Sequence, residues 1–353
     1  MPLFDVYPLY DVTPVSGKGI HVYDDKGTEY LDLYGGHAVI SIGHAHPNYV
    51  EAITNQVNAL GFYSNAIQNP LQRELADKIE ALSGCKDYEL FLVNSGAEAN
   101  ENALKLASFK TGKKRVVAFK KGFHGRTSAA VAATDNPNIV APLNAQQEVT
   151  ILELIDVEGV KQELEKGDVC AVIVEFIQGI GGLDEGSAEF FEEVDALCKA
   201  NNTMFVADEI QCGYARSGKF FAFQYYNVTP DIISMAKGMG NGFPIGGILI
   251  HPDIESKYGM LGTTFGGNHL ACAAGLAVLN TIESENLLEN VNEVGAYFIE
   301  RAKDITQIKE IKGRGLMLGL EFDFEVGGLR KELIYNQKVF TGGAANKKLL
   351  RIL

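Results

Sequence analysis

The chain has 353 residues, of which 46% are hydrophobic and 22% charged, and its formal net charge is −14. These values are typical of a globular protein with an extensive core, most simply built as one large and one small domain. Because the negative charge repels nucleic acid and anionic membranes, we expect small molecules as partners, and neither nucleic acid nor a membrane.

The N-terminus and the cysteines bear on location. The first residues lack the basic start and apolar stretch of a secretion signal, and no apolar run approaches the ~18 residues of a membrane span. The five cysteines are scattered, and none forms a C-x-x-C pair, so neither a disulfide framework nor a zinc site is indicated. We therefore expect a cytoplasmic protein with reduced cysteines.

Short apolar runs alternate with helical segments through the first three quarters of the chain. The runs lie at 90–93, 115–119, 169–174, 203–207, 232–236 and 246–250. They are apolar throughout, as expected for strands buried on both faces, and the segment after the first run has the apolar period of a helix. This alternation predicts an α/β fold with a mainly parallel sheet and helices on both of its faces.

The pattern changes from about residue 277. A long helical pattern extends over 275–305, and an apolar strand pattern follows at 315–322. We predict a large domain formed by residues 48–276 and a smaller α+β domain formed by both chain ends, residues 1–47 and 277–353.

Polar residues follow four of the predicted strands. Residues 94–98 follow the first run, and Glu175, Asp208 and Lys237 come directly after later runs. Because parallel strands present their carboxyl ends at one edge of a sheet, where open α/β sheets bind ligands, we expect these residues to share one site.

The segment NSGAEANENALKLA, residues 94–107, has the order of a phosphate site: a turn after a strand, then a helix. The N–H groups and positive dipole end of such a helix favour an anion. Gly96 permits close approach of the backbone, and Ser95 adds a hydroxyl donor. The alternative is that Ser95 or Asn94 only caps the helix.

A phosphate site, a carboxylate and a lysine in one crevice suggest pyridoxal phosphate. The lysine amine can condense with the aldehyde of this cofactor, and an aspartate can pair with its pyridinium nitrogen. Lys237 and Asp208 are the candidates for these two roles.

At these residues the sequence resembles the fold-type I, class III pyridoxal-phosphate aminotransferases, and among them the acetylornithine and succinylornithine aminotransferases. The likeness covers almost the whole chain. It is carried by GGHAVISIGHAHP (35–47), NSGAEANENALKLA (94–107), FHGRT (123–127), EFIQGIGG (175–182), ADEIQCGYARSG (207–218), AKGMGNGFPIGG (236–247), GTTFGGN (262–268) and GRGLMLGLEF (313–322).

The resemblance implies roles for the cofactor-binding residues. Lys237 would be the Schiff-base lysine and the base that moves a proton between substrate and cofactor. Asp208 would pair with the ring nitrogen, and Gln211 would approach the phenolic oxygen. The phosphate and the ring face would be contacted by Ser95, Gly96, Ala97, Phe123 and His124.

The resemblance also implies substrate contacts and an assembly. Arg126 would take the α-carboxylate of an acylated ornithine, and Glu175 is retained from the family's substrate site. Thr264 corresponds to a threonine that reaches the phosphate bound to the neighbouring subunit, which implies a homodimer. His37 occupies a position near the substrate, and either substrate contact or core packing fits it. His44 and His46 belong to a structural turn, and we expect no metal site.

The chain departs from the family pattern at several places. Lys312 stands where the family commonly has an arginine that binds a carboxylate of 2-oxoglutarate and pairs with the glutamate at position 175, so this role falls to Lys312 or to Arg314. Phe176 and Ile180 replace the usual proline and second glutamate. The family also continues beyond the point where this sequence stops, so we expect a small domain without its last segment.

Together these features predict an aminotransferase of arginine biosynthesis. It would exchange the side-chain amino group between an N-acylornithine and 2-oxoglutarate, giving the semialdehyde and glutamate. The alternatives are an ornithine, 4-aminobutyrate or other ω-amino acid aminotransferase, or a pyridoxal-phosphate aminomutase. The motifs leave open the acetyl or succinyl group, the direction of flux and any assembly above the dimer.

Overall fold

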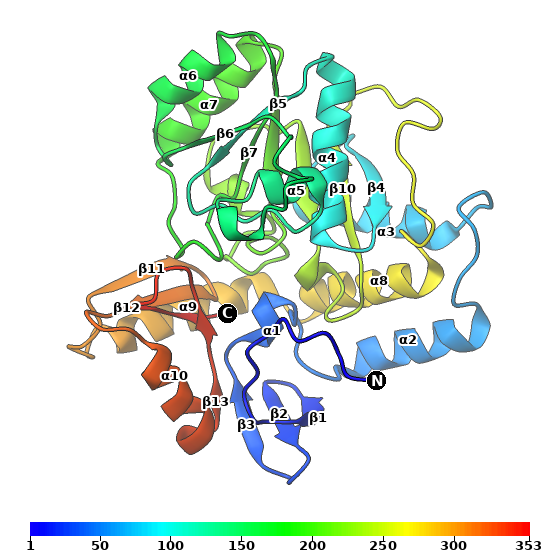
Figure 1. Ribbon diagram of the computed structural model, residues 1–353. Helices are drawn as coiled ribbons and strands as arrows, with labels where there is room; N and C mark the ends of the chain where they lie inside the picture. The colour runs from blue at the N-terminus through cyan, green and yellow to red at the C-terminus, as the bar shows by residue number, and fades with distance from the viewer.

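A seven-stranded sheet forms the centre of the molecule in the computed structural model, which describes all 353 residues (Figure 1). Its strands are β4 (Glu89–Val93), β5 (Arg115–Phe119), β6 (Val149–Leu152), β7 (Val169–Val174), β8 (Met204–Asp208), β9 (Ile232–Met235) and β10 (Gly246–Ile250). Their order is β4-β10-β9-β8-β7-β5-β6. Strands β5 to β9 run parallel, and β10 is antiparallel to both of its neighbours. The predicted, mainly parallel sheet is confirmed.

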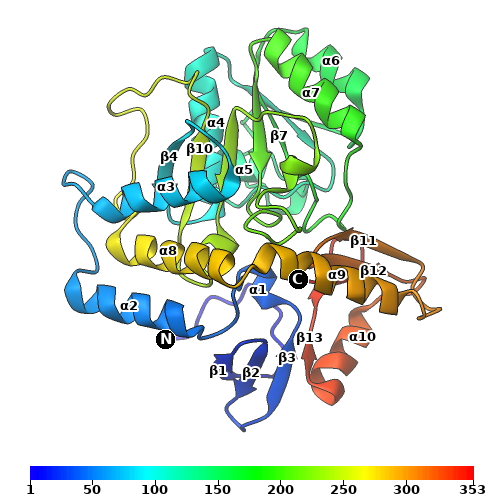
Figure 2. The same cartoon turned by 180° about the vertical axis from the view of Figure 1, so that it is seen from behind.

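Helices cover both faces of this sheet (Figures 1 and 2). The helices of the chain are α1 (Gly35–Ala38), α2 (Pro47–Ala59), α3 (Pro70–Ser83), α4 (Gly96–Thr111), α5 (Ser128–Ala132), α6 (Val157–Leu164), α7 (Ala188–Ala200), α8 (His269–Ser284), α9 (Leu287–Ala302) and α10 (Gly327–Glu332). Helices α4 and α5 lie on one face, and α3, α6, α7 and α8 lie on the other.

Successive side chains of each central strand enter two different cores. On β5, Val117 and Phe119 belong to the larger core, where Phe119 meets Phe190 of α7 edge-on at 5.4 Å. Val116 and Ala118 belong to the core beneath α4. Because side chains alternate between the faces of a strand, burial on both faces requires an unbroken apolar run, which is the pattern that predicted these strands.

Helix α4 is fixed at both ends by its own sequence. The Ser95 hydroxyl accepts a hydrogen bond from the Glu98 N–H at 3.2 Å, and Gly112 ends the helix in the left-handed region at φ 71°. Ala99, Ala103 and similar small residues are fully buried against the sheet. The beginning of α4 is therefore held next to the carboxyl end of β4.

Two smaller sheets form from the ends of the chain. One contains β1 (Pro14–Lys18), β2 (His21–Asp24), β3 (Glu29–Asp32) and β13 (Val339–Phe340), and the other contains β11 (Glu310–Arg314), β12 (Met317–Glu321), β14 (Gly342–Gly343) and β15 (Leu349–Ile352). Strand β13 pairs in parallel with β3, so the two chain ends meet. The strand predicted at 315–322 is confirmed as β12.

The predicted long helix is two helices. The chain leaves the helical conformation between α8 and α9 at Asn286, whose φ is 52°. The proposed domain boundary at 276/277 therefore falls inside α8, which continues to Ser284. We retain the division into a large and a small domain as a proposal, supported by the separate sheets.

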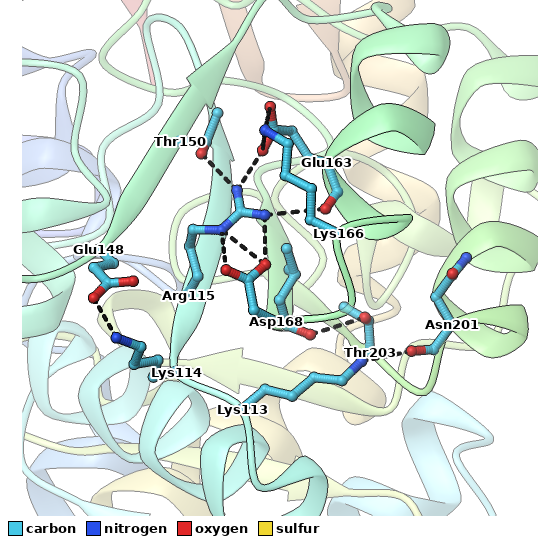
Figure 3. A network of polar contacts seen from close by, with 11 residues as sticks. Lys113, Lys114, Arg115, Glu148, Thr150, Glu163, Lys166, Asp168, Asn201 and Thr203 are labelled. Carbon is cyan, nitrogen blue, oxygen red and sulfur yellow. Dashed lines mark hydrogen bonds and ion pairs between the residues drawn. The ribbon is translucent and has the colours of Figure 1, made fainter.

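An ion-pair network joins the amino ends of β5 and β7 to the edge strand β6 (Figure 3). The Arg115 guanidinium donates to both carboxylate oxygens of Asp168 at 3.0 Å, to the Thr150 hydroxyl at 2.9 Å, and to Glu163. The Arg115 side chain is only 11% exposed. This network lies at the end of the strands opposite Glu175 and Asp208.

None of the helices combines the length and the apolar character needed to cross a lipid bilayer. All five cysteines are buried, and none is paired in a disulfide. The histidines of the GHAHP turn contact separate carboxylates, His44 with Asp32 at 2.8 Å and His46 with Glu285 at 3.0 Å. Each histidine thus has a local structural partner.

Candidate functional site

A cavity of about 380 Å³ opens at the carboxyl ends of β7, β8 and β9. Most of the residues predicted for the cofactor and substrate lie in its wall: Ser95, Gly96, Ala97, Phe123, His124, Arg126, Glu175, Asp208, Gln211 and Lys237. They come from segments spread over more than 140 positions of the sequence, as the strand-end pattern predicted.

Asp208, the last residue of β8, is held by a buried hydrogen-bond network. Its Oδ2 accepts a hydrogen bond from the Asn100 amide at 2.7 Å and lies 2.7 Å from Nδ1 of His124. Its Oδ1 accepts from the Ile210 N–H at 3.1 Å. Burial disfavours a charged His124, but the hydrogen bond and charge of Asp208 outweigh it and raise the His124 pKa. These contacts hold the Asp208 carboxylate in place in the cavity wall.

Asn100 was not predicted. It is fully buried in α4, and the same amide also donates to the His124 carbonyl at 2.7 Å. A polar residue on the apolar side of a helix was the available signal, because a buried amide requires partners. Asn100 therefore ties together two residues of the site.

Lys237 follows β9, and its side-chain amine has no hydrogen bond or ion pair within the chain. Loss of hydration lowers its pKa, against the opposing charges of Asp208 and Glu175. A lysine with a lowered pKa is more often neutral, and the neutral amine is the nucleophilic form. Lys237 can thus react with a carbonyl group in the cavity.

Glu175 lies in the wall between Lys237 and the loop that begins at Phe123. Its carboxylate accepts hydrogen bonds from the Phe123 N–H at 2.8 Å and the Gly179 N–H at 2.9 Å. Burial, with repulsion from Asp208, raises the Glu175 pKa to about 6. Glu175 thereby ties the backbone at Phe123 to the backbone at Gly179.

The beginning of α4 forms one end of the cavity. The Ser95 hydroxyl caps the helix, as expected if Ser95 has a structural role. Ser95 also lines the cavity. The N–H groups of Gly96 and Ala97 are in the first turn and have no partner within the helix. A Cβ on Gly96 would lie 2.8 Å from the Ile210 side chain, so glycine allows this close packing. The geometry suits a bound phosphate.

Arg126 lies at the rim, exposed and without a hydrogen bond or ion pair in the chain. The loop that carries it is anchored by Glu101, whose carboxylate accepts hydrogen bonds from the Thr127 hydroxyl at 2.6 Å and the Ala129 N–H at 2.9 Å. An unpaired guanidinium on an anchored loop is available to an anionic ligand.

His37 is near this site but is not part of the cavity wall. Its carbonyl accepts a hydrogen bond from the Gln211 amide at 3.0 Å, and its ring contacts the Tyr34 hydroxyl. Burial lowers the His37 pKa, and the positive charges of Arg351 and Lys237 lower it further. A neutral imidazole follows at neutral pH, so His37 can offer a hydrogen bond and no charge.

The remaining predicted residues lie outside the cavity. Lys312 of β11 contacts Asp184 at 2.9 Å and Glu321 at 3.1 Å, and it makes no contact with Glu175. Thr264 is exposed on the loop before α8. The cation that the resemblance placed at position 312 is thus engaged elsewhere.

Arg351 of β15 is the buried cation beside the cavity, and the sequence reasoning missed it. It is 3% exposed, and its Nη1 donates to the Gly179 carbonyl at 2.8 Å and to Gln211 Oε1 at 3.3 Å. Its guanidinium donates to carbonyl and amide oxygens and to no carboxylate, and burial lowers its pKa. The available signal was an arginine within the apolar segment 349–353, because a buried cation normally needs an anion.

These residues fit pyridoxal phosphate, the cofactor expected from the sequence. The wall combines an unpartnered amine at Lys237, a carboxylate fixed by two side chains at Asp208, and free N–H groups at the start of α4. They can hold an aldehyde carbon, a protonated ring nitrogen and a phosphate, respectively.

Comparisons with known proteins agree with this geometry. The family model described as aminotransferase class-III matches residues 6–338. An acetylornithine aminotransferase of Caldanaerobacter subterraneus subsp. tengcongensis is 43% identical over 338 residues, which are 92% of this chain and 84% of the relative. The acetylornithine aminotransferase of Bacillus subtilis is 39% identical over 337 residues, covering 94% of this chain and 87% of the relative.

Solved structures of similar fold include two kinds of aminotransferase. The ornithine aminotransferase of Toxoplasma gondii matches with a TM-score of 0.90 at 28% identity, covering 98% of this chain and 86% of that chain. The N-acetylornithine aminotransferase of Stenotrophomonas maltophilia matches with a TM-score of 0.82 at 30% identity, covering 98% of this chain and 90% of that chain.

Proposed function

This chain belongs to the class-III aminotransferase family, and we propose that it transfers the side-chain amino group of an N-acylornithine to 2-oxoglutarate. Membership of the family makes it a pyridoxal-phosphate enzyme of fold type I. The observation that carries the proposal is the cavity whose wall contains Lys237, Asp208 and Arg126. Neither Lys237 nor Arg126 forms an ion pair with a carboxylate of the chain.

Pyridoxal phosphate, when bound, supplies a ring that withdraws electrons from the substrate carbon and so stabilises negative charge there. The Asp208 carboxylate would hold the proton on the ring nitrogen, and its contacts with Asn100 and His124 keep the carboxylate in place. The Lys237 amine would bind the cofactor and then move a proton between substrate and cofactor. Phe123 would lie against the ring face.

Two arginines at the site that lack carboxylate partners, Arg126 and Arg351, are the candidate ligands for the anionic substrates. Arg126 would bind the α-carboxylate of the acylornithine at the rim. 2-Oxoglutarate carries a second carboxylate, and Arg351 would be its ligand. The Gly179 carbonyl and the Gln211 amide oxygen accept hydrogen bonds from Arg351 and orient its guanidinium. A guanidinium matches a carboxylate in shape as well as in charge. Lys312, bound to other carboxylates, is not available for this role.

The charges also favour an acylated ornithine over the free amino acid. Free ornithine would bring an α-ammonium close to Arg126, whereas acylation leaves a neutral amide that is cheaper to desolvate. Neutral His37 can donate or accept one hydrogen bond near the substrate. Discrimination by one displaced charge corresponds to roughly ten- to several-hundred-fold in kcat/KM.

The test measures kcat/KM of the holoenzyme for N-acetylornithine, N-succinylornithine, ornithine and 4-aminobutyrate at one concentration of 2-oxoglutarate, with glutamate as the product assayed. We expect one of the acylated substrates to be best, and Lys237→Ala to form no glutamate. Equal efficiency with ornithine or 4-aminobutyrate would contradict the acylornithine assignment. Amine migration without added 2-oxoglutarate would instead indicate an aminomutase.

We further propose that the enzyme acts as a homodimer in the cytoplasm. The position of Thr264, exposed and outside its own chain's cavity, supports a site shared between two copies. The five unpaired cysteines support a reducing compartment.

A further inference from the structure

A tight hairpin, residues 177–185, connects the cavity to the sheet that contains β11 and β15. Ile177 and Glu185 pair across it in an isolated antiparallel bridge. The Gln178 N–H donates to the Asp184 carbonyl at 3.0 Å, and the Leu183 N–H donates to the Gln178 carbonyl at 2.9 Å. Because of these short-range bonds, the hairpin can be expected to shift as a unit.

Gly179 in the hairpin contacts two charged groups of the site. Its N–H donates to Glu175 Oε2 at 2.9 Å, and its carbonyl accepts from Arg351 at 2.8 Å. A Cβ on Gly179 would lie 1.8 Å from Gln211 Oε1, so the hairpin is packed closely against the cavity wall. Displacement of the hairpin would therefore change the position of both Glu175 and Arg351.

Two parallel ion pairs attach the hairpin to β11. Lys312 Nζ lies 2.9 Å from Asp184 Oδ1, and Arg314 Nε donates to Glu185 Oε2 at 2.8 Å. Lys121, in the loop after β5, contacts the other Asp184 oxygen at 2.6 Å. Asp184 thus joins the C-terminal sheet to the central sheet.

The two ion pairs fix the position of the hairpin on β11 in addition to attracting it. Lys312 and Arg314 are two residues apart on one strand, so they face the same way, and their partners are consecutive in the hairpin. Two adjacent ion pairs fix where along β11 the hairpin lies and how it is oriented relative to this strand. The side chains of Lys312 and Asp184 are 19% and 26% exposed, which limits screening by salt.

We propose that Lys312 and Arg314 are positioning residues for 2-oxoglutarate, acting through Asp184 and Glu185 on the placement of Arg351. This inference rests on the proposed function, because it uses Arg351 as the ligand of a 2-oxoglutarate carboxylate. Lys312 thereby serves the second substrate without touching it.

The experiment compares holoenzyme variants Lys312→Met and Arg314→Met with conservative variants Lys312→Arg and Arg314→Lys, which keep the charges. Lys309→Met is the matched control, because Lys309 lies next to β11 and pairs with Asp323 at 3.7 Å without touching the hairpin. Initial rates give KM and kcat for each substrate separately, and thermal unfolding of each variant is recorded.

We expect both methionine variants to raise the KM for 2-oxoglutarate by about three- to tenfold, with the acylornithine KM and kcat within about twofold of wild type. The conservative variants and Lys309→Met should stay close to wild type. Equal changes in both KM values, or effects no larger than those of Lys309→Met, would overturn the inference and leave the proposed function intact. A wild-type enzyme that forms no glutamate from 2-oxoglutarate would overturn both.

Discussion

Asp208 and Lys237 end neighbouring strands of the central sheet but differ in their partners. The Asp208 carboxylate contacts N–H groups of Asn100, His124 and Ile210, whereas the Lys237 side-chain amine has no partner in the chain. Donors hold a carboxylate in its ionised form, and the absence of an anion leaves an amine free to react. At the scale of single residues, the site separates a fixed charge from a reactive group.

Replacing Asp208 by asparagine tests the fixed charge. Asp208→Asn keeps the shape of the side chain but cannot stabilise a protonated ring nitrogen, so we expect kcat to fall by at least roughly 100-fold while most of the cofactor is retained. Stopped-flow absorbance of the bound cofactor would report proton abstraction directly, and total cofactor content would be measured in parallel.

A buried aspartate outside the cavity provides the control for this variant. Asp195 of α7 is 5% exposed and pairs with Lys199 at 2.8 Å. Asp195→Asn should lower the free energy of unfolding and leave kcat unchanged. Near-normal turnover in Asp208→Asn, or an equal loss in Asp195→Asn, would contradict the role given to Asp208.

At the scale of elements, the sequence predicts what depends on local pattern. The central strands are recognisable because burial on both faces demands continuous apolar runs, and their order predicts that Glu175, Asp208 and Lys237 converge. Strand β6 was missed because it is a half-buried edge strand with a mixed pattern. The break at Asn286 was missed because its left-handed conformation interrupts an otherwise continuous helical period.

The small-domain cations show where local pattern is insufficient. Lys312 and Arg351 lie on strands of one antiparallel sheet, yet only Arg351 reaches the cavity side. Which strand faces the site depends on the pairing of short strands distant in sequence, and neither periodicity nor a family motif specifies it. For this reason, the family motif directs the carboxylate-binding role to Lys312 or Arg314, whereas we propose Arg351 for it.

The Arg115 network predicts a separation between stability and catalysis. Arg115→Met removes a largely buried guanidinium and leaves Asp168 and Glu163 without it, so we expect the free energy of unfolding to fall by about 1.5–3 kcal/mol. Because the network lies at the amino ends of the strands, kcat/KM of the folded enzyme should not change. Denaturant unfolding and steady-state rates measure the two effects.

The neighbouring Lys114 supplies a matched control for the network. Its pair with Glu148 is solvent-exposed, so Lys114→Met should lower the free energy of unfolding by clearly less than Arg115→Met does. Equal destabilisation by the two variants would show that burial adds nothing to the Arg115 network. A loss of kcat/KM in Arg115→Met would show that the two ends of the sheet are coupled.

At the scale of the whole molecule, one copy leaves several large apolar side chains exposed on its surface. Along the N-terminal segment, Leu3, Phe4 and Leu9 are each at least 87% exposed, and Phe265, next to Thr264, is 58% exposed. Exposed apolar side chains of this size fit a surface that a partner covers. They support the proposed homodimer, in which Thr264 of one copy would reach the phosphate site of the other.

The dimer is tested by Thr264→Ala, which should weaken cofactor binding by roughly 1.5–3 kcal/mol through loss of a hydrogen bond to phosphate, without changing the oligomeric state. Thr263→Ala is the control, because the Thr263 hydroxyl is already occupied by the Gly266 N–H at 3.0 Å. Cofactor affinity by titration and molar mass by light scattering distinguish the two variants.

Mixed dimers give the sharper test of a shared site. If each site takes Lys237 from one copy and Thr264 from the other, subunit exchange between Lys237→Ala and Thr264→Ala proteins creates hybrids with one native site and one doubly altered site. Activity at limiting cofactor should then rise above that of either variant alone, because the native site recovers normal cofactor affinity. If both residues come from the same copy, no hybrid contains a native site, and mixing would give only the average of the two variants. A fully active monomer would exclude the shared site directly.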